Sequence, residues 1–297
     1  MKLVLVLLSL LCSFSLYSQK LNQPDSTTFW SNTGNFSLLI SQTAFNNDWL
    51  GGGTSNYAGN IIINYDLNYK KDKIEWDTKF LVDYGITKND SQEFNRKTND
   101  RFEVNSIIGK RLEATKWYLT GNFNFRSQLA DGYTFSTDEN GNETRTLQTE
   151  LLSPAFTNFG IGFQWKKNDN LKVNVAPLSG RLILANDKFT SKSGYKDGDF
   201  FGLNKGETIR EEFGASLNGV AKFDLMENIS VENLLNLYTN YLEDPQNVDI
   251  DYTFNLLLKV NEYISTNFTF QAIYDDNAVK GFQVREVLGA GLRYKFL

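Results

Sequence analysis

The 297-residue chain contains no histidine, one cysteine, two methionines and four prolines. Without histidine it lacks the usual general base of serine and cysteine hydrolases and the commonest protein ligand of transition metals. Enzyme classes that depend on histidine, including lipases, acyltransferases and many proteases, are therefore disfavoured. We expect no enzymatic activity and no cofactor.

The only cysteine, Cys12, lies in the N-terminal segment MKLVLVLLSLLCSFSLYS (residues 1–18). One lysine, a Leu/Val run and then small residues are typical of a secretory signal peptide, and the run is shorter than the roughly 20 residues of a membrane-spanning helix. Leu11 precedes the cysteine, which argues against a lipoprotein signal. Cleavage before Gln19 is expected to leave a mature chain with neither disulfides nor thiol chemistry.

Long apolar runs are missing after residue 18, and the mean hydropathy is −0.38. The formal charge of −5 becomes −6 when the signal peptide removes Lys2, because 29 basic residues then face 35 acidic ones. This acidic balance argues against nucleic acid as a partner. A low mean hydropathy does not exclude a membrane β-barrel, because lumen-facing and loop residues dilute its lipid-facing band.

Apolar and polar residues alternate with a period of two along most of the chain, as in strands with one apolar face. Ile61, Ile63 and Tyr65, for example, alternate with Asn60 and Asn64. Most of these segments exceed the usual globular strand and match the nine to eleven tilted residues of a membrane strand. The pattern predicts twelve strands, at residues 36–43, 57–70, 74–87, 101–112, 117–128, 156–166, 171–185, 208–225, 229–241, 248–260, 264–274 and 283–296.

The predicted connections alternate in length. Tight turns fall at 71–73, 113–116, 167–170, 226–228 and 261–263, and longer loops at 44–56, 88–100, 129–155, 186–207, 242–247 and 275–282. Five short and six long connections place the first and the last strand so that both chain termini lie on the short-turn side. The predicted fold class is all-β: a transmembrane antiparallel up-and-down β-barrel of about 12 strands, with short periplasmic turns and long external loops.

Aromatic residues concentrate near the strand ends, which predicts two belts at the two headgroup levels. Near the short turns these are Tyr69, Trp76, Trp117, Trp165, Phe223 and Tyr294, and near the long loops Tyr57, Tyr84, Phe125, Tyr241 and Tyr274. Aromatics are also common in strands of any kind.

The chain stops on the alternating segment GLRYKFL (residues 291–297), which is similar to the C-terminal insertion signal of outer-membrane barrels. Leu292, Tyr294 and Phe296 are expected to face lipid, and Arg293 and Lys295 the lumen. Because no unpaired strand edge can face lipid, this strand is expected to pair with the first one, residues 35–43. The predicted organisation is a signal peptide (1–18), a periplasmic segment (19–35) and a barrel in the cell outer membrane (36–297).

The seventh predicted strand is irregular, because Pro177 and Gly180 lie in its middle and the alternation changes after them. Proline cannot donate to a strand ladder, so the pattern predicts one inserted residue, a bulge. We favour a purely structural kink over a bulge that directs Arg181 into the lumen.

Four segments resemble a family of outer-membrane barrels defined by a domain of unknown function. They are SQTAFNNDWLGGGTSNYAGN (41–60), LLSPAFTNFGIGFQWKKND (151–169), APLSGRLILAND (176–187) and FFGLNKGETIREEFGASL (200–217). The motif LSP in the second segment is followed along the chain by PLSG in the third. The resemblance implies a barrel fold and an outer-membrane location, and it implies no activity or catalytic residue.

Polar residues at inward positions define the candidate lumen. They are Asp77, Lys79, Asp83, Arg126, Arg181, Arg210, Glu212, Lys222 and Arg293. A hydrolase that uses only carboxylates would need a pair such as Asp77 with Asp83, or Glu211 with Glu212. We expect instead that these carboxylates pair with the neighbouring cations in a polar lumen.

Three loop features have an ordinary explanation as well as a functional one. Residues 137–143 (TDENGNE) are rich in oxygen ligands but lack the EF-hand spacing, so we expect a mobile external hairpin and not a calcium site. Gly51–Gly53 lacks the following lysine and helix of a phosphate loop. Lysines at 188, 192, 196 and 205 alternate with aspartates and indicate a solvated face, although lipopolysaccharide could bind there.

Two functions remain open from the sequence: a small passive channel for polar solutes, and a non-conducting barrel that is a scaffold or accessory subunit of an outer-membrane complex. An intermediate strand number leaves the state of the lumen undecided. A carboxylate-only barrel enzyme is a disfavoured third. Expected partners are outer-membrane lipids and lipopolysaccharide, the barrel-assembly machinery during insertion, and other outer-membrane proteins.

Overall fold

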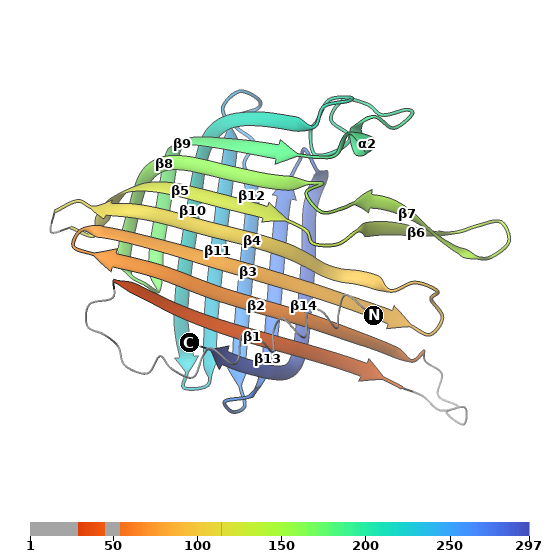
Figure 1. The fold of residues 1–297 in the computed structure, drawn as a ribbon, viewed down its shortest axis with the longest axis horizontal. Coiled ribbons are helices and arrows are strands. Elements are labelled where there is room, and N and C mark those ends of the chain that lie inside the picture. The colour runs from red at the N-terminus through yellow and green to blue at the C-terminus, as the bar shows by residue number, and fades with distance from the viewer. Residues whose placement is uncertain (1–28, 45–53, 114, 297) are drawn as a thin grey trace.

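The computed structural model describes residues 29–44, 54–113 and 115–296, so the predicted signal peptide, Gly51–Gly53 and Leu297 lie outside it. Twelve strands form one closed antiparallel barrel, and two more form a separate hairpin (Figure 1). The barrel strands are β1 (Trp30–Thr43), β2 (Asn56–Lys71), β3 (Ile74–Asn89), β4 (Arg96–Arg111), β5 (Trp117–Ser127), β8 (Ala155–Asn168), β9 (Leu171–Leu184), β10 (Ile209–Met226), β11 (Ile229–Asn240), β12 (Asp249–Lys259), β13 (Ile264–Asp275) and β14 (Val279–Phe296). The hairpin consists of β6 (Gly132–Thr137) and β7 (Glu143–Thr149), and the short helix α2 spans Asp187–Thr190.

The predicted twelve-strand barrel is confirmed. Neighbours in the sequence are neighbours in the barrel, except that β5 pairs with β8 and leaves the β6–β7 hairpin outside. The last strand closes the barrel on the first, as expected, in a register that runs from Gly34↔Phe296 to Ile40↔Ala290. Strand β1 begins at Trp30, six residues before its predicted start. Among the described residues, no helix is long and apolar enough to cross a membrane.

The predicted alternation of loop lengths is wrong at one connection. Strands β13 and β14 are joined by only three residues, 276–278, where a long loop over 275–282 was expected. The ladder continues past a register shift between Tyr274 and Asp275, and Asp275 still pairs with Val279. The β3–β4, β9–β10 and β11–β12 loops lie at the end of the barrel that also carries the hairpin, and α2 belongs to the β9–β10 loop (Figure 1).

The barrel is polar inside and apolar outside, the reverse of a soluble globule. Leu288 is 70% exposed on the outer face of β14, whereas Glu103 is only 3% exposed on the inner face of β4. The other exposed apolar residues of the strands include Ile40, Ile61, Ile108, Phe123, Phe159, Phe163, Leu178, Phe213, Val284 and Leu292. The buried polar residues include Ser37, Thr120, Gln164, Asn174, Glu212, Ser216, Thr253 and Gln271. Period-two alternation along every strand produces this separation.

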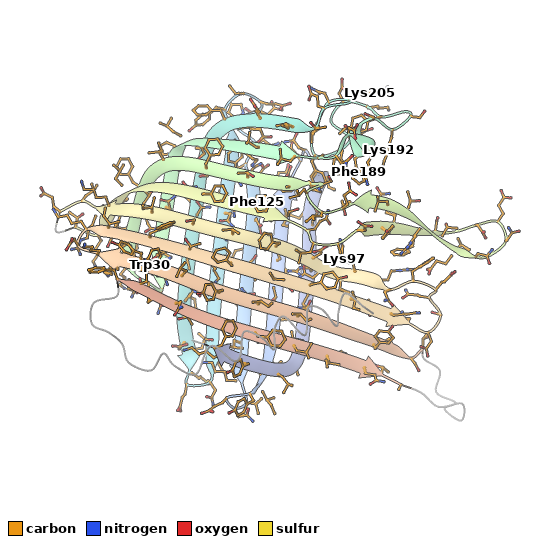
Figure 2. All side chains as sticks on the ribbon, in the orientation of Figure 1. Trp30, Lys97, Phe125, Phe189, Lys192 and Lys205 are labelled. Carbon is orange, nitrogen blue, oxygen red and sulfur yellow. The ribbon has the colours of Figure 1, made fainter. Side chains whose placement is uncertain are left out.

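Exposed aromatic rings lie near both ends of the barrel. Trp30 lies at the short-turn end (Figure 2). Its ring centroid lies 4.9 Å from that of Tyr69 and 5.7 Å from that of Trp76. Other exposed rings are Trp117, Phe223 and Tyr294 at this end and Tyr57 and Tyr241 at the opposite end. Such girdles are typical of the two interfaces of a bilayer, so the apolar band between them is the surface that hydrocarbon would cover.

A charge placed on this band tests which face meets lipid. We expect Leu288→Lys to lower the free energy of unfolding by about 2–4 kcal/mol, because its ammonium would lie near the bilayer midplane. The measurement is equilibrium urea unfolding of the protein folded into liposomes. Val287→Lys is the matched control. Val287 pairs with Thr269 and lies on the inward face of β14, opposite to the face of Leu288. A larger loss for Val287→Lys than for Leu288→Lys would contradict the assignment of the faces.

Candidate functional site: the ion-paired lumen

Ion pairs cross the lumen from wall to wall. Lys79 Nζ on β3 lies 3.3 Å from Glu232 Oε1 on β11, and these two strands lie on opposite sides of the barrel order. Arg126 Nη1 on β5 lies 2.7 Å from Asp251 Oδ2 on β12. Arg101 on β4 approaches the same carboxylate at 3.8 Å. The barrel is therefore narrow enough for two side chains, one from each wall, to meet across the lumen.

A second group of charges lies near the short-turn end. Lys166 Nζ on β8 contacts Glu75 Oε2 at 2.6 Å and Asp77 Oδ2 at 3.5 Å, and Lys172 Nζ on β9 lies 3.0 Å from the same Asp77 atom. Tyr118 Oη donates to Glu75 Oε1 at 3.0 Å. These contacts join β3 to strands on the far side of β4 and β5, so they narrow the lumen at this end.

A third group lies near the external end and depends on a bulge in β9. The register of β9 shifts against both neighbours, between Ile161 and Phe163 on β8 and between Gly214 and Ser216 on β10. The predicted bulge is thus present. Beyond it, Arg181 Nη1 pairs with Asp249 and approaches Glu212 Oε2 at 3.6 Å. The bulge therefore does more than bend the strand, because it turns Arg181 into the lumen.

Eight of the nine predicted lumen residues take part in these contacts or in neighbouring ones. Besides those described, Lys222 Nζ lies 2.8 Å from Glu232 Oε1, Arg210 Nε lies 2.9 Å from Glu212 Oε1, and Asp83 accepts from Asn60 Nδ2 at 2.9 Å. Arg293 shares the inward face of β14 and has no ion pair within the described part of the chain. Other charged residues of these contacts were not predicted as site residues: Glu75, Arg101, Glu103, Lys166, Glu232, Asp249, Asp251 and Arg285.

The carboxylate pairs that an enzyme would need are not formed. Asp77 and Asp83 lie six residues apart on one strand, which separates them by about 20 Å at 3.3 Å per residue. The disfavoured pair of Glu211 with Glu212 is not formed either, and the expected pairing with neighbouring cations is observed for Glu212, which contacts Arg181 and Arg210. Adjacent strand residues point to opposite faces, so Glu212 is buried inside the barrel and Glu211 is exposed outside it.

The loop between β9 and β10 narrows the external mouth. Leu203, fully buried, joins Phe200 and Phe201 in packing against Phe156 and Ile183, which face inward at the ends of β8 and β9. Arg210 Nη1 also donates to the Gly202 carbonyl at 2.6 Å. The same loop carries Lys192 and Lys205, which lie beyond the barrel end near Phe189 (Figure 2). This loop therefore covers one inner wall of the mouth.

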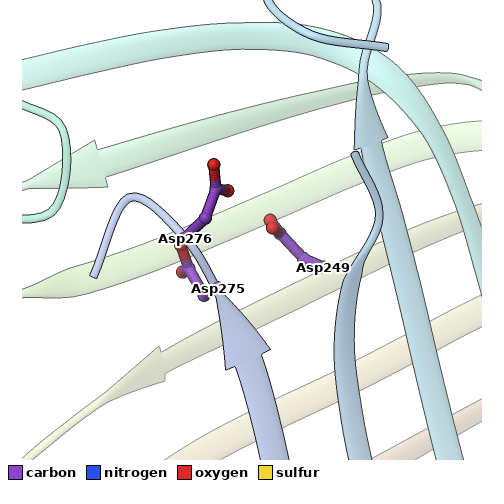
Figure 3. A group of neighbouring side chains, drawn as sticks. All are labelled: Asp249, Asp275 and Asp276. Carbon is purple, nitrogen blue, oxygen red and sulfur yellow. The ribbon is translucent and has the colours of Figure 1, made fainter. Parts of the chain in front are cut away.

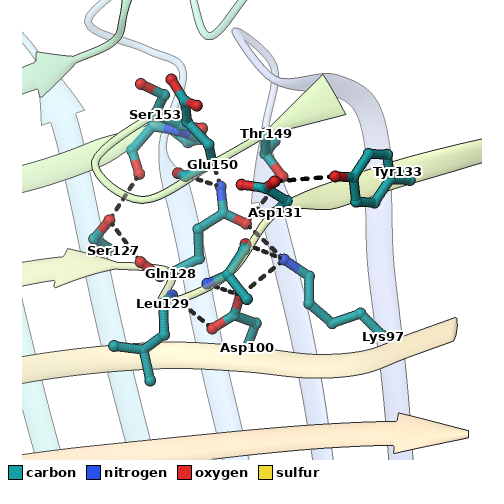
Figure 4. A network of polar contacts seen from close by, with 12 residues as sticks. Lys97, Asp100, Ser127, Gln128, Leu129, Asp131, Tyr133, Thr149, Glu150 and Ser153 are labelled. Atoms are coloured by element: carbon teal, nitrogen blue, oxygen red, sulfur yellow. Dashed lines mark hydrogen bonds and ion pairs between the residues drawn. The ribbon is translucent and has the colours of Figure 1, made fainter. Parts of the chain in front are cut away.

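The β6–β7 hairpin is held at its base by a polar network (Figure 4). Lys97 Nζ donates to Asp100 Oδ2, Gln128 Oε1 and the Ala130 carbonyl at 2.8, 3.1 and 2.8 Å. Asp100 in turn accepts from the Leu129 and Ala130 amides at 2.7 and 2.9 Å. The network joins the start of β4 to both ends of the hairpin segment, because Gln128 Nε2 also donates to the Glu150 and Ser153 carbonyls.

A second contact holds the hairpin along its side. Glu143 on β7 forms an ion pair with Arg96, and its Oε2 accepts from the Glu93 and Phe94 amides at 2.9 and 3.1 Å. The Arg96 guanidinium also lies 3.3 Å from the centre of the Phe135 ring. The hairpin therefore has a defined orientation on the β3–β4 loop.

Two acidic groups at the external end have local partners. Asp249, Asp275 and Asp276 bring carboxylate oxygens within 4.8 Å of one another (Figure 3). However, Asp249 is paired with Arg181, and Asp275 Oδ1 accepts from the Asn277 and Ala278 amides.

In the oxygen-rich hairpin turn, Asp138 Oδ1 accepts from the Asn140 and Asn142 amides. These hydrogen bonds, the Asn142 amide first, hold the pKa of Asp138 below its ordinary value.

The family comparison covers the first third of the barrel. Residues 40–133, less than half of the 297-residue chain, match a family described as "Protein of unknown function (DUF3078)". The match confirms the predicted resemblance to a family of unknown function for this part of the chain. It includes segment 41–60, and the three other resembling segments lie beyond it. No curated protein matches the chain.

Several solved outer-membrane barrels align with almost the whole chain. The translocator domain of autotransporter NalP from Neisseria meningitidis covers 99% of this chain and 98% of its own, at 9% identity and a TM-score of 0.38. The COG4313 outer membrane channel from Pseudomonas putida F1 covers 93% and 99%, at 12% identity and a TM-score of 0.39. The outer membrane channel DcaP of Acinetobacter baumannii covers 90% and 97%, at 7% identity and a TM-score of 0.33. The barrel assignment itself rests on the closed strand order.

The Glu143 contact predicts a pH dependence of the hairpin. The hydrogen bond from Arg96, followed by those from the Phe94 and Glu93 amides, holds the pKa of Glu143 below its ordinary value of 4.5. The stabilisation is therefore complete above about pH 4.5 and is lost as the pH falls through the lower folded-state pKa. We expect hydrogen-exchange protection factors of the Glu93 and Phe94 amides to fall over that range, and Glu143→Gln to lower them already at pH 7.

Glu139→Gln is the control, because Glu139 lies in the same hairpin and forms no ion pair within the described residues. It should leave both protection factors and their pH profile unchanged. Equal effects of the two variants would show that the hairpin responds to total charge and not to the Arg96 contact.

Proposed function

We propose that the protein is an outer-membrane β-barrel that is closed to free diffusion of solutes and is a scaffold or accessory subunit of an envelope complex. The ion pairs that cross the lumen carry this proposal. Separating Lys79 from Glu232, or Arg126 from Asp251, would leave the cation without its carboxylate in a partly dehydrated interior. That is costly, so the bridged state is the resting state. The loop between β9 and β10, which covers one inner wall of the external mouth, supports the same conclusion.

Export and insertion belong to the same proposal. The N-terminal segment directs the chain across the inner membrane and is removed before Gln19. The barrel-assembly machinery reads the outward residues Leu292, Tyr294 and Phe296 of β14, of which Leu292 and Tyr294 are 58% and 59% exposed. Lipids cover the apolar band, and lipopolysaccharide lies against the external loops.

The β6–β7 hairpin is the segment that we expect to bind a partner. It projects beyond the external end (Figure 1), and Glu143 and the Lys97 network fix its orientation. A fixed arm is better suited to holding a partner than a free loop, because less ordering entropy is lost on binding.

A second candidate, the small passive channel, is favoured by one observation. Several lumen charges keep contact with solvent, and the Lys222 side chain is 39% exposed. Water therefore reaches the lumen, and a polar solute could follow it if the bridging side chains moved aside. Conductance separates this candidate from the closed barrel.

Planar bilayers provide that test. We expect the wild-type protein to give no discrete conductance steps, and the double variant Arg126→Ala/Asp251→Ala to give them, because one link across the lumen is removed. Arg293→Ala is the control, since Arg293 faces inward without an ion pair within the described residues, and it should stay silent. Folding of each variant is checked by heat-modifiable electrophoretic mobility. Discrete steps from the wild-type protein would favour the channel.

The scaffold function is tested by removing the hairpin. Replacing residues 132–149 with a short Gly-Ser linker should leave a heat-modifiable barrel, because β6 and β7 pair only with each other. Pull-downs from detergent-solubilised outer membranes should then lose polypeptides that the full-length protein retains. If both proteins retain the same polypeptides, the hairpin is not the docking arm. Failure of the shortened chain to fold would show that this segment templates the barrel.

A further inference from the structure

A groove of about 690 Å³ crosses the outer surface of the barrel, away from the lumen. It extends over β3, β4, β5, β8, β9 and β10. Its walls are mostly outward-facing apolar side chains, among them Trp76, Ile108, Phe123, Phe159, Ile161 and Leu178.

The groove exists because one cross-strand row lacks a side chain at its centre. Trp76, Ile108, Gly121, Ile161 and Leu178 are successive partners on five neighbouring strands. A Cβ atom at Gly121 would meet only Ile108 Cγ2, at 3.7 Å. The large residues on both sides therefore form walls around an empty floor.

The groove spans the apolar band between the aromatic belts. At the short-turn end the groove reaches Trp76, which belongs to the aromatic belt there. Towards the external end it reaches Phe213, whose ring lies 5.9 Å from that of Tyr241 in the external belt. Polar atoms along it already satisfy one another, since Trp76 Nε1 donates to Ser106 Oγ at 2.7 Å and Ser106 Oγ lies 3.0 Å from Thr78 Oγ1. An occupant at this depth needs to be apolar, because the side chains that form the walls are apolar.

The external end of the groove carries a carboxylate. Glu211 lines the groove at the third residue of β10, is exposed on the outer face, and has no hydrogen bond or ion pair within the described part of the chain. A carboxylate at the edge of a lipid-facing surface is stabilised by a cationic partner, and Glu211 lies where an apolar groove can hold the rest of such a ligand. Charge complementarity requires that the partner of Glu211 be a cation.

We propose that the groove binds one acyl chain of an amine-bearing lipid, with the ammonium group of the lipid against Glu211. The apolar walls exclude water along the chain, the floor at Gly121 admits its methylene groups, and the carboxylate selects the headgroup. The inference rests on the proposed outer-membrane location. It does not depend on the closed lumen, so a conductance result leaves it unchanged.

Native mass spectrometry of the full chain in mixed micelles tests the proposal. The micelles contain phosphatidylethanolamine and phosphatidylglycerol with the same acyl chains in equal amounts. We expect the wild-type protein to retain phosphatidylethanolamine in preference. Glu211→Gln should reduce that preference about two- to fivefold, the effect of one exposed ion pair. Gly121→Phe, which fills the floor, should reduce retention of both lipids.

Two matched variants separate the groove from the general surface. Glu286→Gln neutralises a carboxylate on the outer face of β14, and Gly59→Phe fills an outward glycine of β2, where a Cβ atom would meet nothing within 4 Å. Both should behave like the wild type, and all variants must show the heat-modifiable mobility of a folded barrel. Equal retention of the two lipids by the wild type, or equal effects of Glu211→Gln and Glu286→Gln, would overturn the proposal. A polypeptide found in the groove in place of lipid would also overturn it.

Discussion

The hydrogen-bonded closure of β14 on β1 is the constraint on which the rest of this structure depends. At bilayer depth an unpaired backbone N–H or C=O has no water to bond, so an open sheet edge is excluded. The register from Gly34↔Phe296 to Ile40↔Ala290 removes both edges at once. Closure also divides every strand into one face that meets hydrocarbon and one that meets the lumen. All later features follow from this division.

Inside the wall, closure brings together charges that are far apart in the sequence. Glu232 on β11 meets both Lys222 on the adjacent strand and Lys79 across the barrel. Charges with reduced access to water need partners of opposite sign. The ion pairs that neutralise the inward charges are therefore the same contacts that bridge the lumen. Outside the wall, one groove combines two departures from the apolar cover, the missing side chain at Gly121 and the carboxylate of Glu211. Their position in one groove suggests a common ligand.

The strands could be predicted because period-two alternation and turn chemistry are local properties. The closing pair followed from backbone hydrogen bonding, without any knowledge of side chains. The β13–β14 connection was misjudged because the ladder continues through a bulge after Tyr274, which local alternation hides. The hairpin strands β6 and β7 were not predicted as strands, since they are short and pair only with each other. Glu211 and Glu212 were considered as one possible carboxylate pair, although strand geometry alone places adjacent residues on opposite faces.

The sequence by itself determined that the chain forms a barrel of twelve strands with one polar and one apolar face, because the alternation of each strand is a property of neighbouring residues. Only the tertiary structure decided that Lys79 meets Glu232, that Arg126 meets Asp251, and that Leu203 packs onto the inner wall of the mouth. Distances across a closed barrel depend on strand number, register and curvature together. No local pattern contains them, and they decide whether the lumen is open or bridged.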